Sequence, residues 1–245
     1  MSKHEFIENS TAISNDLPST NSARHHACLT LDQSDRLRLI RFPATTIHIV
    51  RKAILASWPR GLQNEKEYAG AYEFKFCGYP WLGQGIEAVQ SRVMMMSVLS
   101  ALYHQGWYIV ASTDVSKKQH DKDLLIFQLG VPPPTTSFFA VSFNERDKLR
   151  LIGAPYEVIS AVQEIIGTND IRHEKWIYSE TAYQFKLHNR PWTAIDYKMV
   201  TSRMELLELL DCFESLGWEL YASINLSTGH EGSHTDTWFC RRSNR

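Results

Sequence analysis

The sequence lacks the short motifs by which catalytic, metal-binding and nucleotide-binding proteins are usually recognised. Its four cysteines, Cys28, Cys77, Cys212 and Cys240, show no Cys-x-x-Cys spacing, and none lies near a histidine pair in a metal-ligand pattern. There is no Gly-x-Ser-x-Gly nucleophile motif, and the run Gly83-Gln84-Gly85 lacks the third glycine of a phosphate-binding loop. We therefore expect no catalytic residue, no metal and no cofactor, and the sequence favours a protein that is not an enzyme.

Long apolar runs and an excess of charge of one sign are also missing. The apolar stretch Val93–Leu99 is far too short to span a bilayer. The first 26 residues are polar and have no apolar segment of the signal-peptide type, so we expect a disordered tail on an intracellular, cytoplasmic protein. With 26 basic and 27 acidic residues, the chain has no basic footprint for nucleic acid or an anionic membrane.

One histidine pair has a spacing that occurs in metal sites. His230 and His234 are four residues apart, with Glu231 and Asp236 nearby. They lie in a Gly- and Ser-rich turn rather than on a helix, which predicts a solvated hairpin tip.

What the chain does have is an internal repeat. When residues 72–116 are placed on residues 183–227, 14 of the 45 positions are identical. The matches include Pro-Trp, Ser-Arg and Gly-Trp pairs, whereas composition alone would give roughly three matches. We therefore predict two copies of one unit.

The boundaries follow from the extent of the repeat. We predict a tail at 1–26, repeat 1 at 27–129 and a linker at 130–137, followed by repeat 2 at 138–242 and a tail at 243–245. The linker contains three consecutive prolines, which favour a stiff, extended spacer.

Each unit is predicted to be a two-layer α/β sandwich of order ββαβαββ. Alternating apolar residues predict strands, for example around Tyr72, Phe74 and Phe76, and a loop is expected before this strand. Apolar residues spaced by three and four predict two helices on one face of the sheet. The fold class is therefore α+β, a tandem duplication whose copies we expect to be related by a pseudo-twofold axis.

The second helix of each unit carries the longest apolar pattern. In the second copy we predict one buried side made of Val200, Met204, Leu207, Leu210 and Phe213. A glycine, Gly106 or Gly217, ends each helix in a position that favours left-handed backbone.

The repeated arginines, Arg92 and Arg203, lie within or beside these apolar helix faces. A buried guanidinium needs partners, and Asp123 or Asp236 could supply one. The alternative is an arginine that binds an anionic ligand, since its planar fork suits a carboxylate or phosphate.

The sheet face away from the helices is polar in both copies. It could face solvent, meet the other copy or bind a ligand at the junction between the copies. The candidate ligand-binding residues are the two arginines with Lys75, Lys186, Ser112 and Ser223.

Trp81 and Trp192 follow a proline in the loop before the second helix. Each could cover the edge of the core or contact a partner.

Our leading hypothesis is a non-catalytic, intracellular adaptor that binds a protein partner through its paired sheet faces or these tryptophan loops. The alternative is a protein, possibly an enzyme, that binds a small anionic ligand between the repeats. Binding of single-stranded nucleic acid is the third possibility, and the balanced charge opposes it.

Overall fold

The chain forms two six-stranded antiparallel sheets, each accompanied by two helices. The computed structural model describes residues 25–113, 124–226 and 236–243. The strand order is β3-β4-β2-β1-β6-β5 in repeat 1 and β9-β10-β8-β7-β12-β11 in repeat 2, so equivalent strands occupy equivalent places. This confirms the predicted α+β tandem duplication.

The elements of repeat 1 are β1 (His26–Asp32), β2 (Arg36–Ile40), α1 (Ala44–Ser57), β3 (Leu62–Tyr68), β4 (Ala71–Phe76), α2 (Ile86–His104), β5 (Trp107–Thr113) and β6 (Leu124–Leu129). Those of repeat 2 are β7 (Phe138–Asn144), β8 (Lys148–Ile152), α3 (Tyr156–Ile166), β9 (Ile171–Ile177), β10 (Ala182–Leu187), α4 (Tyr197–Ser215), β11 (Trp218–Ile224) and β12 (Thr237–Arg242). A 3-10 turn carries each Pro-Trp pair, at Pro80–Leu82 and Pro191–Thr193.

The order of elements within a unit differs from the prediction by one strand. The segment expected to be a loop contains the edge strand β3, or β9 in repeat 2, so the unit is ββαββαββ. All side chains of both strands are exposed or half-buried. Because neither face of such an edge strand is covered, it carries no apolar alternation by which it could be recognised.

The predicted tail at 1–26 falls almost entirely outside the described residues, as does the histidine-containing turn at 230–234. The linker at 130–137 contains no helix or strand and has hydrogen bonds to both repeats. The Tyr108 hydroxyl donates to the Val131 carbonyl oxygen (2.6 Å), and the Thr136 hydroxyl donates to the carbonyl oxygen of Arg242 (2.8 Å).

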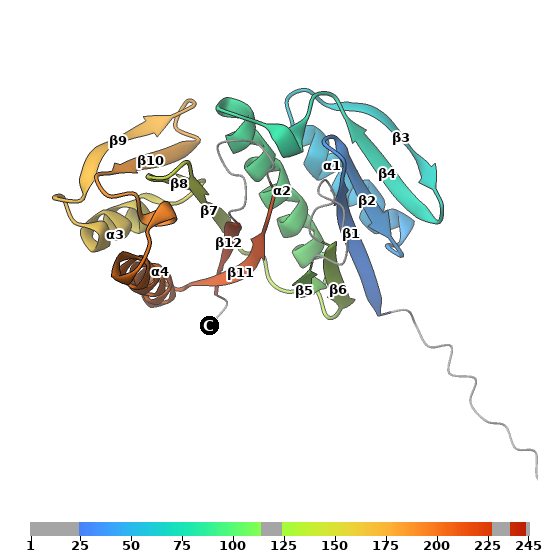
Figure 1. The fold of residues 1–245 in the computed structure, drawn as a ribbon. Helices are drawn as coiled ribbons and strands as arrows, with labels where there is room; N and C mark the ends of the chain where they lie inside the picture. The colour runs from blue at the N-terminus through green and yellow to red at the C-terminus, as the bar shows by residue number, and fades with distance from the viewer. Residues whose placement is uncertain (1–24, 114–123, 227–235, 244–245) are drawn as a thin grey trace, which may run out of the picture.

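The two repeats stack in four layers, as Figure 1 shows from left to right. Helices α3 and α4 form one outer layer, the sheet of repeat 2 follows, then the layer of α1 and α2, and the sheet of repeat 1 is the other outer layer. Helix α2 therefore lies between the two sheets. A twofold axis would also place α4 against the first sheet, and this is not the arrangement found.

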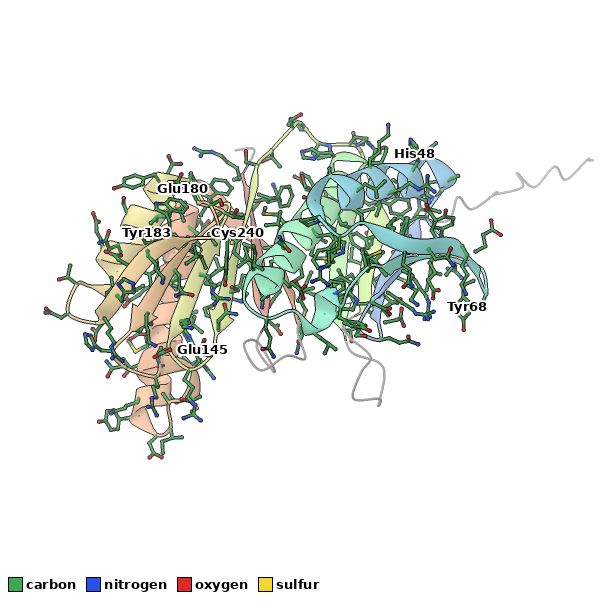
Figure 2. All side chains as sticks on the ribbon, turned by 90° about the horizontal axis from the view of Figure 1, so that it is seen from above. His48, Tyr68, Glu145, Glu180, Tyr183 and Cys240 are labelled. Carbon is green, nitrogen blue, oxygen red and sulfur yellow. The ribbon has the colours of Figure 1, made fainter. Side chains whose placement is uncertain are left out.

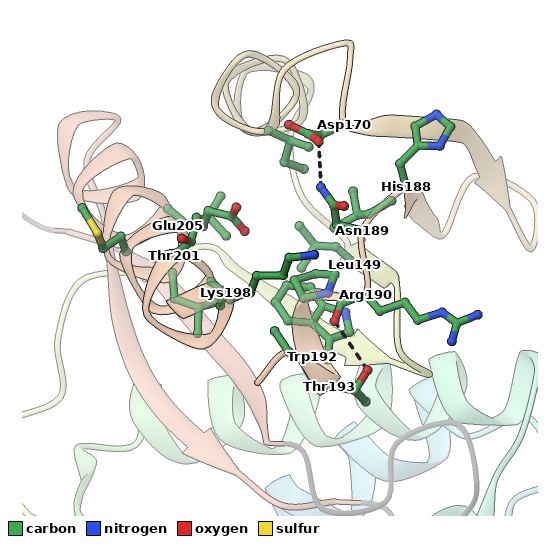
Figure 3. A pocket seen from close by; sticks show the side chains of 18 of the residues that line it. Leu149, Asp170, His188, Asn189, Arg190, Trp192, Thr193, Lys198, Thr201 and Glu205 are labelled. Carbon is green, nitrogen blue, oxygen red and sulfur yellow. Dashed lines mark hydrogen bonds between the residues drawn. The ribbon is translucent and has the colours of Figure 1, made fainter. Parts of the chain in front are cut away.

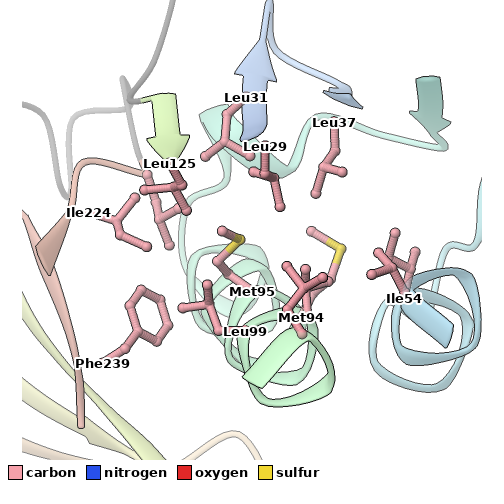
Figure 4. Close-up of a cluster of buried hydrophobic side chains, with 14 of the residues drawn as sticks. Leu29, Leu31, Leu37, Ile54, Met94, Met95, Leu99, Leu125, Ile224 and Phe239 are labelled. Carbon is pink, nitrogen blue, oxygen red and sulfur yellow. The ribbon is translucent and has the colours of Figure 1, made fainter. Parts of the chain in front are cut away.

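Contacts from one face of α2 hold the repeats together. The Arg92 guanidinium Nε donates to the hydroxyl of Thr237 on β12 at 3.1 Å. The Tyr103 ring packs edge to face with Phe138 and Tyr221, at centroid distances of 5.6 and 5.3 Å. In Figure 4, Leu99 faces Ile224 and Phe239 of repeat 2, while Met95 faces the sheet of repeat 1. The junction is thus a continuation of the hydrophobic core of repeat 1.

Strand β7 shows how the packing of α2 changes the burial of the sheet of repeat 2. All seven of its residues are buried, whereas its counterpart β1 alternates between buried and more exposed positions. The alternation of β1 is typical of a sheet covered on one face, and complete burial is typical of a sheet covered on both.

The polar residues of the two sheets differ along with this difference in burial. On the open sheet of repeat 1, Arg38 forms ion pairs with Asp32 (2.9 Å) and Glu73 (2.7 Å). The residues equivalent to these carboxylates in repeat 2 are the amides Asn144 and Gln184, and Gln184 accepts a hydrogen bond from Arg150 at 2.8 Å. The amide keeps the hydrogen-bond acceptor for the buried guanidinium of Arg150 and carries no negative charge.

The uncovered face of the sheet of repeat 1 carries paired charged side chains. Burial alone would raise the pKa of Glu73, but hydrogen bonds from Arg38 and Arg36 outweigh it and hold the pKa below the usual range. Figure 2 shows Tyr68 at the far end of this repeat, where its ring lies under Arg38 (4.7 Å) and Lys66 (5.3 Å). This face is an extended network of charges.

Candidate functional site

The outer face of helix α4 exposes a row of large apolar side chains. Tyr197, Val200, Met204 and Leu207 follow one another by three or four residues and so share one side of the helix. Their exposed fractions are 75, 56, 56 and 61%. We refer to these four residues together with Arg203 as the α4 outer face.

This finding corrects the predicted orientation of α4. Val200, Met204 and Leu207 were expected to be buried, but the buried side of the helix carries Ser202, Leu209 and Phe213. Both α2 and α4 carry apolar residues on two sides. On α2 the second side packs against the sheet of the other repeat, whereas on α4 no second sheet of the described chain covers it.

The equivalent positions on α2 show how these residues are buried when a sheet covers the helix. Val89, the counterpart of Val200, is 1% exposed, and Arg92, the counterpart of Arg203, is 2% exposed. Met96, the counterpart of Leu207, is half-buried and lies against Gly153 of repeat 2. The same kind of helix face is therefore an interface in repeat 1 and a surface in repeat 2.

A second feature of repeat 2 is a cavity of about 900 Å³ between α4, the end of α3 and the loop that carries Trp192. Its apolar part includes Leu149, Ile166 and Leu187, and Figure 3 shows Asp170, Glu205 and Lys198 among its polar residues. Partial burial raises the pKa of Glu205, and the negative charges of Asp170 and Glu208 act in the same direction.

The two predicted arginines lie in different environments. Arg92 is buried at the junction, where it donates to Thr237 and also to the carbonyl oxygen of Ala88 (2.6 Å). Arg203 is exposed on α4. Of the two aspartates considered as partners, Asp123 lies outside the described residues and Asp236 accepts a hydrogen bond from Ser223 at 2.7 Å.

The remaining candidate ligand residues do not form one site with the arginines. The ammonium of Lys75 lies 4.0 Å from Asp35, and that of Lys186 lies 3.9 Å from Asp147, the same contact in each repeat. Ser112 is exposed on β5. None of the six predicted residues lines the cavity of repeat 2.

The two tryptophans of the Pro-Trp loops also differ. Trp81 is fully buried, which fits the first alternative, a cover for the edge of the core, and corrects the second, because a partner cannot reach this indole. Trp192 is half-buried and lines the cavity. Both indoles keep the same hydrogen bond, to the carbonyl oxygens of Arg36 (2.9 Å) and Lys148 (3.0 Å) respectively.

The described parts of the chain hold neither a cluster of metal ligands nor a membrane-spanning helix. Within them no group of three or more His, Cys, Asp or Glu residues is arranged to hold a metal ion. None of the helices there is both long enough and apolar enough to cross a lipid bilayer.

Comparison with known proteins gives one result. A family model for a single domain matches the chain twice, over residues 25–128 and 137–241. The chain therefore belongs to the family defined by this domain and contains two copies of it. No curated protein and no solved structure matches the chain significantly.

The sequence contained signals for both features of repeat 2. Val200, Met204 and Leu207 were recognised as apolar, but a helix pattern does not reveal how many neighbours a helix has. The cavity is indicated by large core residues of repeat 1 that have small or charged counterparts in repeat 2, and that comparison needs the observed loop alignment.

Proposed function

We propose that this chain is a non-catalytic, intracellular protein-binding module whose partner covers the α4 outer face. The observation that carries the proposal is the exposure of Val200, Met204 and Leu207, whose counterparts on α2 are buried (Val89) or half-buried (Val93 and Met96). An apolar row of this kind, flanked by polar residues, is typical of a helix that docks on another protein surface.

The junction within the chain indicates the chemistry of the partner. Helix α2 packs on a sheet face that offers small apolar residues such as Ala140 and Ala182, the ring of Phe239, and the hydroxyl of Thr237 for its arginine. Arg203 occupies the place of Arg92 on α4. The partner surface is therefore proposed to be a largely uncharged sheet face that bears a hydrogen-bond acceptor for Arg203.

A second copy of the same chain is a poor partner by this criterion. The free sheet of repeat 1 would have to bury Asp32, Glu73 and their arginines under the apolar side chains of α4. Desolvation of such ion pairs costs several kcal/mol per ion before any attraction is regained. Stacking of copies through this face is therefore disfavoured, and a different protein is proposed.

The proposal is tested by capturing the partner with variants of the full chain. Met204→Glu combined with Leu207→Glu places two charges in the centre of the α4 outer face and is expected to abolish capture. Both side chains are exposed, so the change in the free energy of unfolding should be within about 1 kcal/mol.

The matched control is Leu55→Glu, which changes an exposed leucine (54%) on α1. It should leave capture intact. Equal capture by wild type, the double variant and the control would show that α4 is not the binding surface.

A further inference from the structure

The cavity of repeat 2 occupies the place of an aromatic cluster in repeat 1. There Trp58, Phe76 and Met94 are all nearly or fully buried. Trp58 packs edge to face on Phe76 (6.3 Å between centroids), which packs in the same way on Trp81 (5.6 Å). In repeat 1 the equivalent space is therefore filled by the protein itself.

In repeat 2 each of the three filling residues is replaced. Helix α3 has 11 residues where α1 has 14, and the residue after it is Gly167 in place of Trp58. After the shorter helix the two repeats align again, with Asp170 at the position of Gly61. The same backbone hydrogen bond marks this alignment: the Cys77 N–H donates to the Gly61 carbonyl oxygen, and the His188 N–H donates to that of Asp170. Leu187 and Glu205 stand at the positions of Phe76 and Met94.

Repeat 1 also shows what kind of group fits the space. The indole N–H of Trp58 donates to the carbonyl oxygen of Cys77 at 3.0 Å. The equivalent residue in repeat 2 is His188, which lines the cavity. A ring in the place of Trp58 would lie beside Leu187, which occupies the position of Phe76, and Trp192 keeps the place of Trp81 in the lining of the cavity.

The charges that line the cavity distinguish it from its filled counterpart. Asp170, Glu205 and Glu208 occupy positions that are Gly61, Met94 and Ser97 in repeat 1, so all three carboxylates are specific to repeat 2. A positive charge on a ligand would relieve the repulsion that contributes to the raised pKa of Glu205.

Two cations also line the cavity. Figure 3 shows Arg190 directed away from Asp170 and Glu205, while Lys198 extends from α4 into the cavity, below both carboxylates in this view. Lys198 is exposed, and its flexible stem allows its ammonium to move into solvent when a ligand amine arrives.

We propose that this cavity binds a small aromatic amine. Its ring takes the place of the Trp58 ring, a ring N–H donates to the carbonyl oxygen of His188, and its ammonium faces Glu205 and Asp170. A volume of about 900 Å³ is within the range of small-molecule sites. The cavity borders the α4 outer face, because Tyr197 and Met204 line it as well. The argument for the cavity rests on the missing aromatic cluster and does not depend on the protein partner.

Titration calorimetry on the full chain tests the proposal with two indole probes. Tryptamine carries both the ring N–H and the amine, whereas indole-3-propionate has the ring and a carboxylate. We expect tryptamine to bind wild type at least tenfold more tightly than indole-3-propionate.

Glu205→Met restores the residue of repeat 1 and is therefore expected to fold, while lowering the affinity for tryptamine at least tenfold. The matched control is Glu214→Met, an exposed glutamate of the same helix that does not line the cavity. It should leave the affinity unchanged. The proposal is overturned if wild type binds no tryptamine, if indole-3-propionate binds as tightly, or if Glu205→Met binds tryptamine as wild type does.

Discussion

Val89→Asp is expected to destabilise the protein by roughly 4 kcal/mol or more, while Val200→Asp should change its stability by less than about 0.5 kcal/mol. The two valines are equivalent residues, each the fourth residue of its helix. Helix propensity and the favourable effect of a negative charge near a helix N-terminus are therefore the same for both substitutions. What differs is burial, 1% against 56%.

The measurement is thermal and urea unfolding of both variants beside wild type. At about 2–4 °C per kcal/mol for a chain of this size, Val89→Asp should lower Tm by roughly 10 °C or more. Similar losses for both variants would show that the α4 outer face is covered within the free protein, and equal tolerance would show that α2 does not lie between the sheets.

Trp58→Ala is expected to cost about 3–5 kcal/mol of stability, the usual range for removing a large aromatic side chain from a core. The variant loses the ring contact with Phe76 and the hydrogen bond to the Cys77 carbonyl oxygen, and it opens in repeat 1 the space that is already open in repeat 2. Urea unfolding measures this cost.

The control for this prediction is Trp176→Ala, on the edge strand β9. Trp176 is 40% exposed, so its removal should cost less than about 1 kcal/mol. If Trp58→Ala were as mild as the control, the aromatic cluster of repeat 1 would not be the filled counterpart of the cavity.

Much of the fold could be predicted from the sequence because the unit occurs twice. Repeated matches such as Pro80-Trp81 with Pro191-Trp192 show the duplication, and two versions of each strand and helix support each assignment. The exceptions are β3 and β9. Their sequences, from Leu62 and from Ile171, are mostly polar because they are edge strands with little burial on either face.

How the two repeats pack against each other could not be predicted from the repeat pattern. A repeat tells how each copy folds, and it does not tell how the copies pack. The continuous apolar sequence of β7 and the change from Asp32 and Glu73 to Asn144 and Gln184 both indicate a sheet buried on two faces. They could be interpreted only once the packing of α2 was known.

The candidate sites were predicted least well for the same reason. Repeated residues such as Arg92 and Arg203 attract attention because they match, yet they lie in opposite environments. The α4 outer face and the cavity both arise where repeat 2 differs from repeat 1 in packing or in sequence. Differences between copies were therefore the more informative signal.

The most direct test of the proposed binding surface is photo-crosslinking from position 207 in cells that express the full chain. A photoreactive residue replaces Leu207 on α4, and the control carries it at the equally exposed Leu55 on α1. We predict one discrete protein adduct from position 207, with the crosslinked peptide in a largely uncharged sheet of the partner, and none from position 55. No adduct from position 207, or the same adduct from both positions, would contradict a partner on the α4 outer face.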